Sequence, residues 1–168
     1  MSKILSIDAS TKSTGIAVYD NKELKHYECI TATNSDVLKR IKIMTSRIEE
    51  IVNEYSIDEI IMEDVLPEDV KHNQNVFKAL HYLQASIVLK MHDYKKDVQL
   101  VNVNRWRKAC GITIGRYGVR SSAKVQDMKF VKDTFGIDAN DDICDAICIG
   151  WAYVNTNLFA EEKNEFAF

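Results

Sequence analysis

The stretch Asn140-Asp-Asp-Ile-Cys-Asp-Ala-Ile-Cys-Ile-Gly150 joins an acidic start to an apolar continuation. This pattern predicts a buried helix that begins near Asn140, with Asn140 or Asp138 as its N-cap. Asp142 and Asp145 are three residues apart, so their side chains leave one face of that helix, one turn from each other. Asp145 lies among apolar residues, where a carboxylate is normally paired, hydrogen-bonded or bound to a metal. The helix therefore presents a carboxylate pair that needs a partner.

The neighbouring Asp141 has a simpler explanation. An acid in the first turn complements the positive end of the helix dipole, and this role requires no ligand. The three-residue spacing to Asp145 favours Asp142 over Asp141 as the first functional acid of the helix. The sequence leaves the choice between the two open.

Two earlier segments also run from apolar residues into acids. Lys3-Ile-Leu-Ser-Ile-Asp8 and Asp58-Glu-Ile-Ile-Met-Glu63 are typical of buried strands. The period of two along a strand places Glu63 and Asp64 on opposite faces, so at most one of them shares a given site. If the two strands lie side by side, a helix docked across them brings Asp142 and Asp145 towards Asp8 and Glu63.

The other segments predict an α/β fold in one domain over residues 1–158, followed by a tail at 159–168. Tight turns join the first three strands into an antiparallel meander, and the first and fourth strands can then pair. We expect a five-stranded mixed sheet, with this meander plus two parallel strands, flanked by helices. The predicted strands are 3–8, 14–19, 24–31, 58–63 and 98–103, and the predicted helices are 37–55, 73–94, 105–110, 123–134 and the one from Asn140.

The composition is that of a globular protein. With 168 residues, 46% of them hydrophobic, the chain can bury a proper core. No apolar run is long enough to span a bilayer, and the N-terminus lacks the apolar region of a signal peptide. We therefore expect a cytoplasmic protein without membrane contact. The four cysteines show no CxxC spacing and are expected to remain reduced.

Charge is distributed unevenly along the chain. The net charge is -3, yet residues 105–132 contain eight basic residues and Asp127 as their sole acid, a net +7 that leaves -10 elsewhere. A local basic segment in an acidic protein indicates a nucleic-acid contact that neutralises phosphates without reading bases.

Four carboxylates in one cleft repel one another unless divalent cations hold them. A ligand set made only of oxygen atoms favours Mg2+ or Mn2+ over zinc. Such a pair of ions suits phosphodiester hydrolysis, because one lowers the pKa of the attacking water and the other stabilises the leaving 3′ oxygen.

Five segments, in this order and spacing, resemble the RuvC-type Holliday-junction resolvases of the RNase H-like superfamily: 4–8, 14–18, 60–63, 105–111 and 141–147. The resemblance implies an RNase H-like fold and a homodimeric endonuclease that nicks two strands of a four-way DNA junction symmetrically, with two Mg2+ ions in each active site. It assigns catalysis and metal binding to Asp8, Glu63, Asp142 and Asp145. The basic residues that fall in the DNA-binding region of the family are Arg105, Arg107, Lys108, Arg116, Arg120 and Lys124.

Two positions depart from the family pattern. Ser6-Ile-Asp-Ala-Ser10 replaces the usual Gly-Ile-Asp-Pro-Gly, and Leu66 stands where the family commonly has an aromatic wedge that enters the junction. Apolar side chains other than aromatic ones can also unstack a base step. These departures resemble phage-encoded or divergent members, which act on a broader set of branched DNA.

Three alternatives remain open at this point. One is a general nuclease for branched DNA. Another is a different RNase H-like enzyme, either a YqgF-type nuclease acting on RNA or an actin-like ATPase, although the small size and the glycine-poor turn at 9–14 disfavour the ATPase. The last is a binding module without catalysis. For the resolvase, symmetric nicking needs two sites related by a two-fold axis, and the 73–94 helix is the expected dimer interface.

Overall fold

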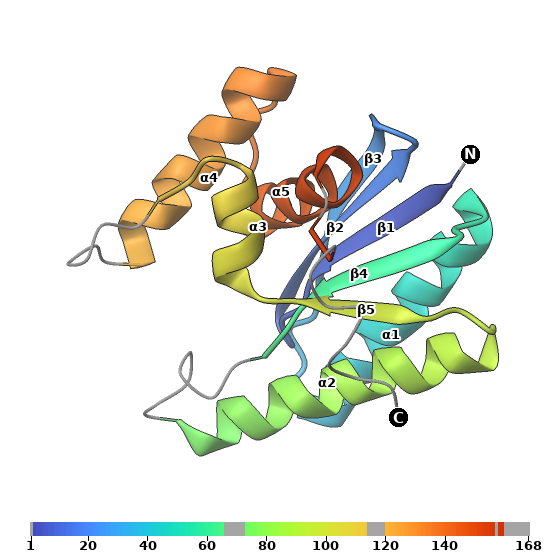
Figure 1. Cartoon of the computed structure of the whole chain (residues 1–168). Coiled ribbons are helices and arrows are strands. Elements are labelled where there is room, and N and C mark those ends of the chain that lie inside the picture. Colours follow the sequence, from blue (N-terminus) through green and yellow to red (C-terminus); the bar gives the residue numbers. More distant parts are fainter. Residues whose placement is uncertain (1, 66–72, 114–119, 157, 160–168) are drawn as a thin grey trace.

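Figure 1 shows the chain as a computed structural model, which describes residues 2–65, 73–113, 120–156 and 158–159, with the backbone alone at 120 and 121. The elements follow the predicted order: β1 (Lys3–Asp8), β2 (Ser13–Asp20), β3 (Glu23–Thr31), α1 (Val37–Tyr55), β4 (Glu59–Glu63), α2 (Gln74–Asp93), β5 (Val98–Val101), α3 (Val103–Ala109), α4 (Arg120–Phe135) and α5 (Asp141–Asn155). Among the helices of these residues, none is long and apolar enough to cross a membrane.

The sheet has the strand order β3-β2-β1-β4-β5. The first three strands pair antiparallel, whereas β4 pairs parallel with both β1 and β5. This arrangement confirms the predicted meander with two added parallel strands. Ile7 on β1 is in register with Met62 on β4, so the next residues, Asp8 and Glu63, lie at neighbouring carboxyl ends.

Helices cover both faces of the sheet (Figure 1). The pair α1 and α2 packs on one face, while α3 and α5 pack on the other with α4 outside them. Alternation along β1 sends Leu5 and Ile7 into the α1/α2 core and Ile4 into the α5 core. The same period carries Asp8 to the α5 face.

Two glycines allow α5 to approach the sheet very closely. A Cβ atom on Gly15 of β2 would lie 1.9 Å from the backbone oxygen of Asp142, and one on Gly150 of α5 would lie 2.4 Å from Cε2 of Tyr19. Real Cβ contacts of this length do not occur, so a side chain at position 15 would need the space of the α5 backbone, and one at position 150 would need the space of the Tyr19 ring. The start of α5, with its acids, is thereby held against β2.

Buried hydroxyl groups on β1 and β2 also hold α5 in place through hydrogen bonds to its backbone. Ser6 Oγ donates to the carbonyl of Ala146 at 2.7 Å, and the Tyr19 hydroxyl donates to the carbonyl of Ile147 at 2.8 Å. Ser6, Tyr19 and Ala146 have no exposed surface, so these bonds replace water that the groups would otherwise need. They define the register of α5 on β1 and β2.

Several boundaries differ from the predicted ones for local reasons. The strand predicted to reach residue 103 ends at Val101, because the Asn102 side chain accepts from the Asn104 N–H at 2.8 Å and caps α3. Of the two predicted N-caps of α5, Asn140 and Asp138, the structure shows Asn140, whose side chain accepts from the Ile143 N–H at 3.0 Å. Phe159, which the prediction placed in the tail, packs against Tyr153. All four cysteines are free in the structure.

Candidate active site

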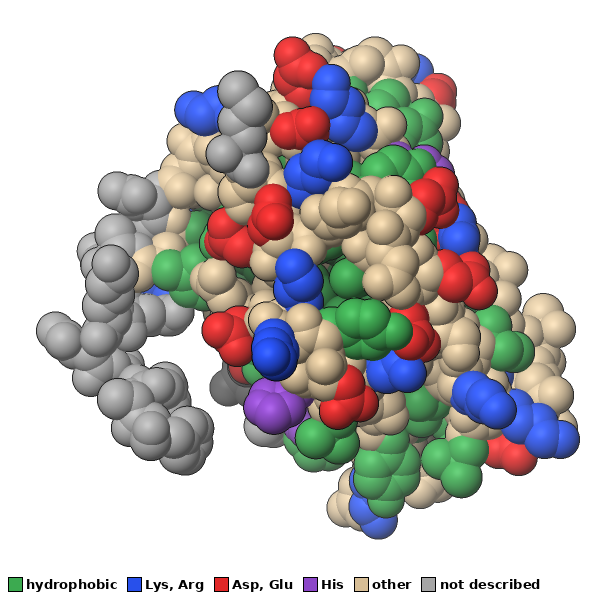
Figure 2. All heavy atoms as spheres, turned by 90° about the vertical axis from the view of Figure 1, so that its right-hand side faces the viewer, with side chains coloured by type: hydrophobic (Ala, Val, Ile, Leu, Met, Phe, Trp, Pro, Cys, Tyr) green, Lys and Arg blue, Asp and Glu red, His purple; other side chains and the backbone are tan. Residues whose placement is uncertain are grey.

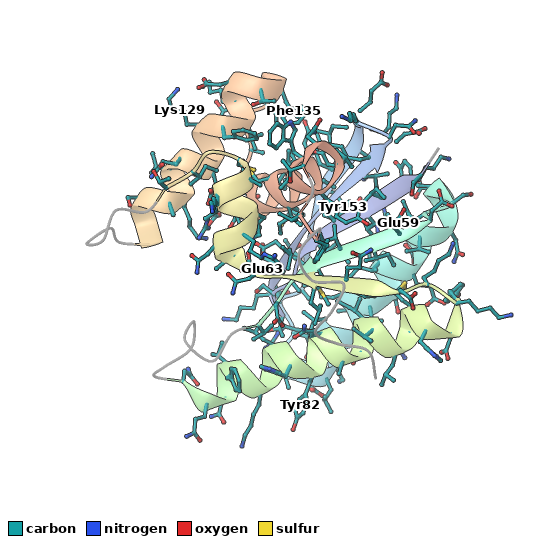
Figure 3. The ribbon with its side chains drawn as sticks, viewed as in Figure 1. Glu59, Glu63, Tyr82, Lys129, Phe135 and Tyr153 are labelled. Carbon is teal, nitrogen blue, oxygen red and sulfur yellow. The ribbon has the colours of Figure 1, made fainter. Side chains whose placement is uncertain are left out.

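The four predicted carboxylates line one cleft at the carboxyl ends of β1 and β4. The cleft has a volume of about 910 Å³, and its wall includes Asp8, Glu63, Asp142 and Asp145. Glu63 lies where β4 ends, next to α3 (Figure 3). Residues from β1, β4 and α5 thus meet in one space although they are far apart in the sequence.

Glu63 and its neighbour Asp64 both line the cleft, but they face different helices. On β4, Ile60 and Met62 belong to the α1/α2 core and Ile61 to the α5 core, so Glu63 faces α5 and Asp8. Asp64 turns to the other layer, where its carboxylate accepts a hydrogen bond of 3.1 Å from Gln84 on α2. Glu63 is therefore the acid that shares the face of Asp8 and α5.

Asp141 and Asp142 also have different partners. Asp141 forms an ion pair with Lys124 of α4, and the hydrogen bond from Lys124 lowers the pKa of Asp141. Asp142 instead accepts a hydrogen bond from the Ser13 hydroxyl at the start of β2 and lines the cleft. The geometry favours Asp142 over Asp141 as the acid that acts with Asp145.

Asp145 is the most enclosed of the four acids, with 6% of its surface exposed. Its Oδ2 lies 3.7 Å from Nη2 of Arg107, and its Oδ1 is buried without a hydrogen-bond partner. Burial, together with the carboxylates of Asp8 and Asp127, raises the pKa of Asp145 to about 9. A buried carboxylate oxygen that lacks a donor is a fitting place for a cation.

The donor set fits a hard divalent cation, but the side chains do not form a finished cage. Among the described residues, no three His, Cys, Asp or Glu side chains lie close enough together to hold a metal ion as they stand. The convergence is thus looser than the sequence suggested. Mg2+ retains several water ligands and commonly binds through one or two carboxylates, so acids that line a shared cleft remain suitable for it.

The predicted DNA-binding residues are accessible, buried or outside the described part of the chain. Lys124 lines the cleft, Lys108 is exposed on α3 and Arg105 is half-buried. Arg107 is the exception, because it is buried and donates to Asp127 at 2.8 and 3.1 Å, so its charge is already neutralised within the protein. Arg107 lines the cleft all the same, so its contact with phosphates stays a prediction, although this pairing leaves little of its charge for one. Arg116 and the wedge candidate Leu66 lie outside the described residues, as does the side chain of Arg120.

Two further basic residues line the cleft from the other side. Lys12 lies in the turn between β1 and β2, and Arg40 lies on α1. The Arg40 guanidinium donates to the carbonyls of Thr11 at 3.0 Å and Asn34 at 2.7 Å, which hold it near the turn. Sequence reasoning missed both, because they lie outside the basic segment 105–132, in the part of the chain whose net charge is negative.

The face that carries the N-terminus has a different character. Figure 2 shows basic and acidic side chains interspersed on it, without a broad surface of one sign. Mixed charges of this kind give a weak field and poor attraction for a nucleic acid. The cleft is therefore the better candidate for the nucleic-acid contact.

Comparison with known proteins agrees with this architecture. The profile of the family described as "Crossover junction endodeoxyribonuclease RuvC" matches residues 4–152. Among curated proteins, no relative matches the chain.

Several solved structures are similar in fold to this chain. Thermus thermophilus RuvC in complex with a Holliday junction substrate superposes with a TM-score of 0.73 at 13% identity, covering 95% of each chain. A second Thermus thermophilus RuvC structure has a TM-score of 0.71 at 12% identity, covering 94% of this chain and 95% of the other. The yeast mitochondrial Holliday junction resolvase Ydc2 has a TM-score of 0.59 at 12% identity and covers 91% of this chain and 78% of the other.

The fold agrees with the RNase H-like arrangement that the sequence implied, since the five-stranded mixed sheet is that of the RuvC structures. The family profile spans nearly the whole chain, from β1 into α5, and so includes all the elements that carry the cleft acids. The chain belongs to the RuvC family of crossover junction endodeoxyribonucleases.

Proposed function

We propose that this protein resolves four-way DNA junctions by hydrolysis of phosphodiester bonds, with Asp8, Glu63, Asp142 and Asp145 as ligands of two divalent cations. The observation that carries the proposal is the meeting of these four acids in one cleft that Lys124 also lines. Bound Mg2+, for which Mn2+ can substitute, supplies an activated water and stabilises the leaving oxygen.

The protein's own residues then have separate tasks. The Ser13 hydroxyl orients the Asp142 carboxylate by its hydrogen bond, while the buried Asp145 offers an oxygen that has no other partner. Exclusion of water around Asp145 strengthens its attraction for a cation. These acids hold the ions at the ends of β1 and β4, where the scissile phosphate enters.

Basic residues bind the DNA backbone on both sides of the acids. On one side, Arg105, Lys108 and Lys124 belong to the basic segment, to which Arg116 and Arg120 also contribute charge. Lys12 and Arg40 line the cleft on the other side. Contacts with phosphates position the duplex arms without selecting bases, so the shape of the junction determines where the protein binds.

Symmetric nicking of two strands requires two copies of this site, and we propose a homodimer formed through α2. Tyr82 is 56% exposed and Leu89 68% exposed on this helix, and Figure 3 shows Tyr82 on the side turned away from the sheet. Exposed apolar side chains on one helix are typical of a protein interface. Sedimentation equilibrium tests this point, and a monomer at the concentration used for cleavage would contradict it.

Cleavage of a labelled four-way junction in Mg2+ tests the main proposal. Linear duplex, flap and RNA substrates are the comparison, and Asp145→Asn is the inactive control, since it removes a ligand charge while keeping the side-chain shape. Paired symmetric nicks in the junction alone are expected. Retained cleavage by Asp145→Asn would contradict the assigned site. Because Leu66 replaces the aromatic wedge of the family, cutting of flaps as well would indicate a general branched-DNA nuclease, and cutting of RNA alone a YqgF-like activity.

A further inference from the structure

Helix α3 places a buried tryptophan against one of the cleft acids. Trp106 has no exposed surface, and its Nε1 donates to Oε2 of Glu63 at 2.7 Å. An indole has a single polar atom, which is a donor, so the ring orientation is determined by this acceptor. Glu63 in turn is held by a group that cannot move without disturbing the core.

The next residue of α3 reaches a second cleft acid. Arg107 donates to Asp127 of α4 at 2.8 and 3.1 Å, and its Nη2 lies 3.7 Å from Oδ2 of Asp145. The guanidinium also lies over the Trp106 ring, 4.7 Å from the ring centroid. Asp127 is fully buried, so it fixes the plane of the guanidinium and with it the contact to Asp145.

We propose that Trp106 and Arg107 are positioning residues that set the distance between Glu63 and Asp145 for cation binding, with Asp127 as the anchor of Arg107. This inference rests on the proposed function, in which Glu63 and Asp145 are metal ligands. Hydrogen-bond partners of ligating side chains orient the ligand, and their loss commonly lowers metal affinity 10- to 100-fold. Neither residue is exposed enough to bind DNA, so their effect on junction binding should be small.

Two conservative variants of the full chain test the role. Trp106→Phe keeps a buried aromatic ring and removes the N–H donor. Arg107→Lys keeps the charge but loses the planar, two-point geometry. Matched controls are Trp151→Phe, where the ring packs edge-on against Phe130 in the α4/α5 layer, and Arg47→Lys, where the guanidinium is bound twice by Glu28 on the other layer.

Mn2+ affinity of the metal-free protein, measured by electron paramagnetic resonance, is the deciding measurement. We expect the Mn2+ affinity to fall about 10-fold or more in both α3 variants and to stay unchanged in both controls. The affinity of the α3 variants for the junction without metal should stay within a factor of about two of wild type, as for residues that do not touch phosphate. The Mg2+ concentration for half-maximal cleavage should rise by the same factor, with the rate at saturating Mg2+ largely restored.

The outcomes separate this inference from the function on which it depends. Wild-type protein that binds no Mn2+ overturns the proposed function and the positioning role together. If Trp106→Phe binds Mn2+ as tightly as the wild-type protein, the positioning role alone is overturned. An equal loss in Trp151→Phe also overturns it, because the effect would then be a general loosening of the core. Should Arg107→Lys fail to fold, Trp106→Phe decides the question.

Discussion

Replacement of Gly15 by alanine should displace the beginning of α5 and disable the active site. The added Cβ would lie 1.9 Å from the backbone oxygen of Asp142, whereas ordinary contacts begin at 3.4 Å, so the helix must retreat by the difference of about 1.5 Å. Gly15 lies within β2 and does not have a positive φ, so alanine suits its backbone and the cost is steric. Overpacking of this kind destabilises a fold by about 3 kcal/mol.

The same retreat moves Asp142 away from Asp8 and Glu63. A misplacement of about 1 Å in a catalytic constellation can reduce the rate about 100-fold, and we expect a loss of at least that size in junction cleavage. Urea unfolding measures the stability change, and single-turnover cleavage of a labelled four-way junction measures the rate.

Gly136 provides the control for this experiment. Its φ is +71°, and a Cβ there would have no neighbour within 4 Å, so Gly136→Ala should lose about 1 to 2 kcal/mol through left-handed backbone strain while cleaving normally. A Gly15→Ala protein that is as stable and active as wild type would refute the reasoning, since α5 would then not depend on the close approach.

Three other predictions follow from the acids and cations of the cleft. The pKa of Asp145 is raised to about 9 from its ordinary 3.8, so its contribution to stability is fully present below pH 4 and is lost as pH rises towards 9. Urea unfolding in EDTA should therefore show a free energy of unfolding that falls over this pH range in the wild type and not in Asp145→Asn. Asp142→Asn should abolish Mn2+ binding, measured by calorimetry, whereas Asp141→Asn should preserve it, and the reverse result would exchange their roles. Lys124→Ala should weaken junction binding and reduce the slope of log affinity against log salt by about one, while Lys129→Ala, on the outer side of α4 and paired with Asp133, should leave the slope unchanged (Figure 3).

Much of the sheet and the cleft was predictable, because local signals and chain order suffice for them. Two strands end on Asp8 and Glu63, and the last helix begins on acids. Once β1 and β4 pair, these carboxylates lie at the carboxyl ends of neighbouring strands. The period of two also predicted that at most one acid of the fourth strand shares the site; in the structure Glu63 faces α5, whereas Asp64 accepts a hydrogen bond from Gln84 of α2.

Burial and close approach were not predictable in the same way. Arg107 entered the sequence analysis as one more cation of a basic segment, because composition reports charge and not whether water reaches it. The only sign of its role was Asp127, the single acid among eight basic residues, twenty positions further along the chain. Gly15 gave no sign at all, since a glycine within a strand becomes informative only when the helix that crosses it is known.

The burial of Asp127 also explains how a cation site can exist beside an arginine. Two unit charges 4 Å apart interact by about 4 kcal/mol at the effective dielectric constant of a protein surface, and more in the interior. Without a counterion, Arg107 at 3.7 Å would neutralise Asp145 and repel any cation that approached it. Asp127 is the nearer partner of Arg107, at 2.8 Å, so Arg107 compensates less of the negative charge that Asp145 acquires when a divalent ion displaces its proton. Asp127, the lone acid of the basic segment, thus allows Arg107 to orient the Asp145 carboxylate without replacing a cation as its partner.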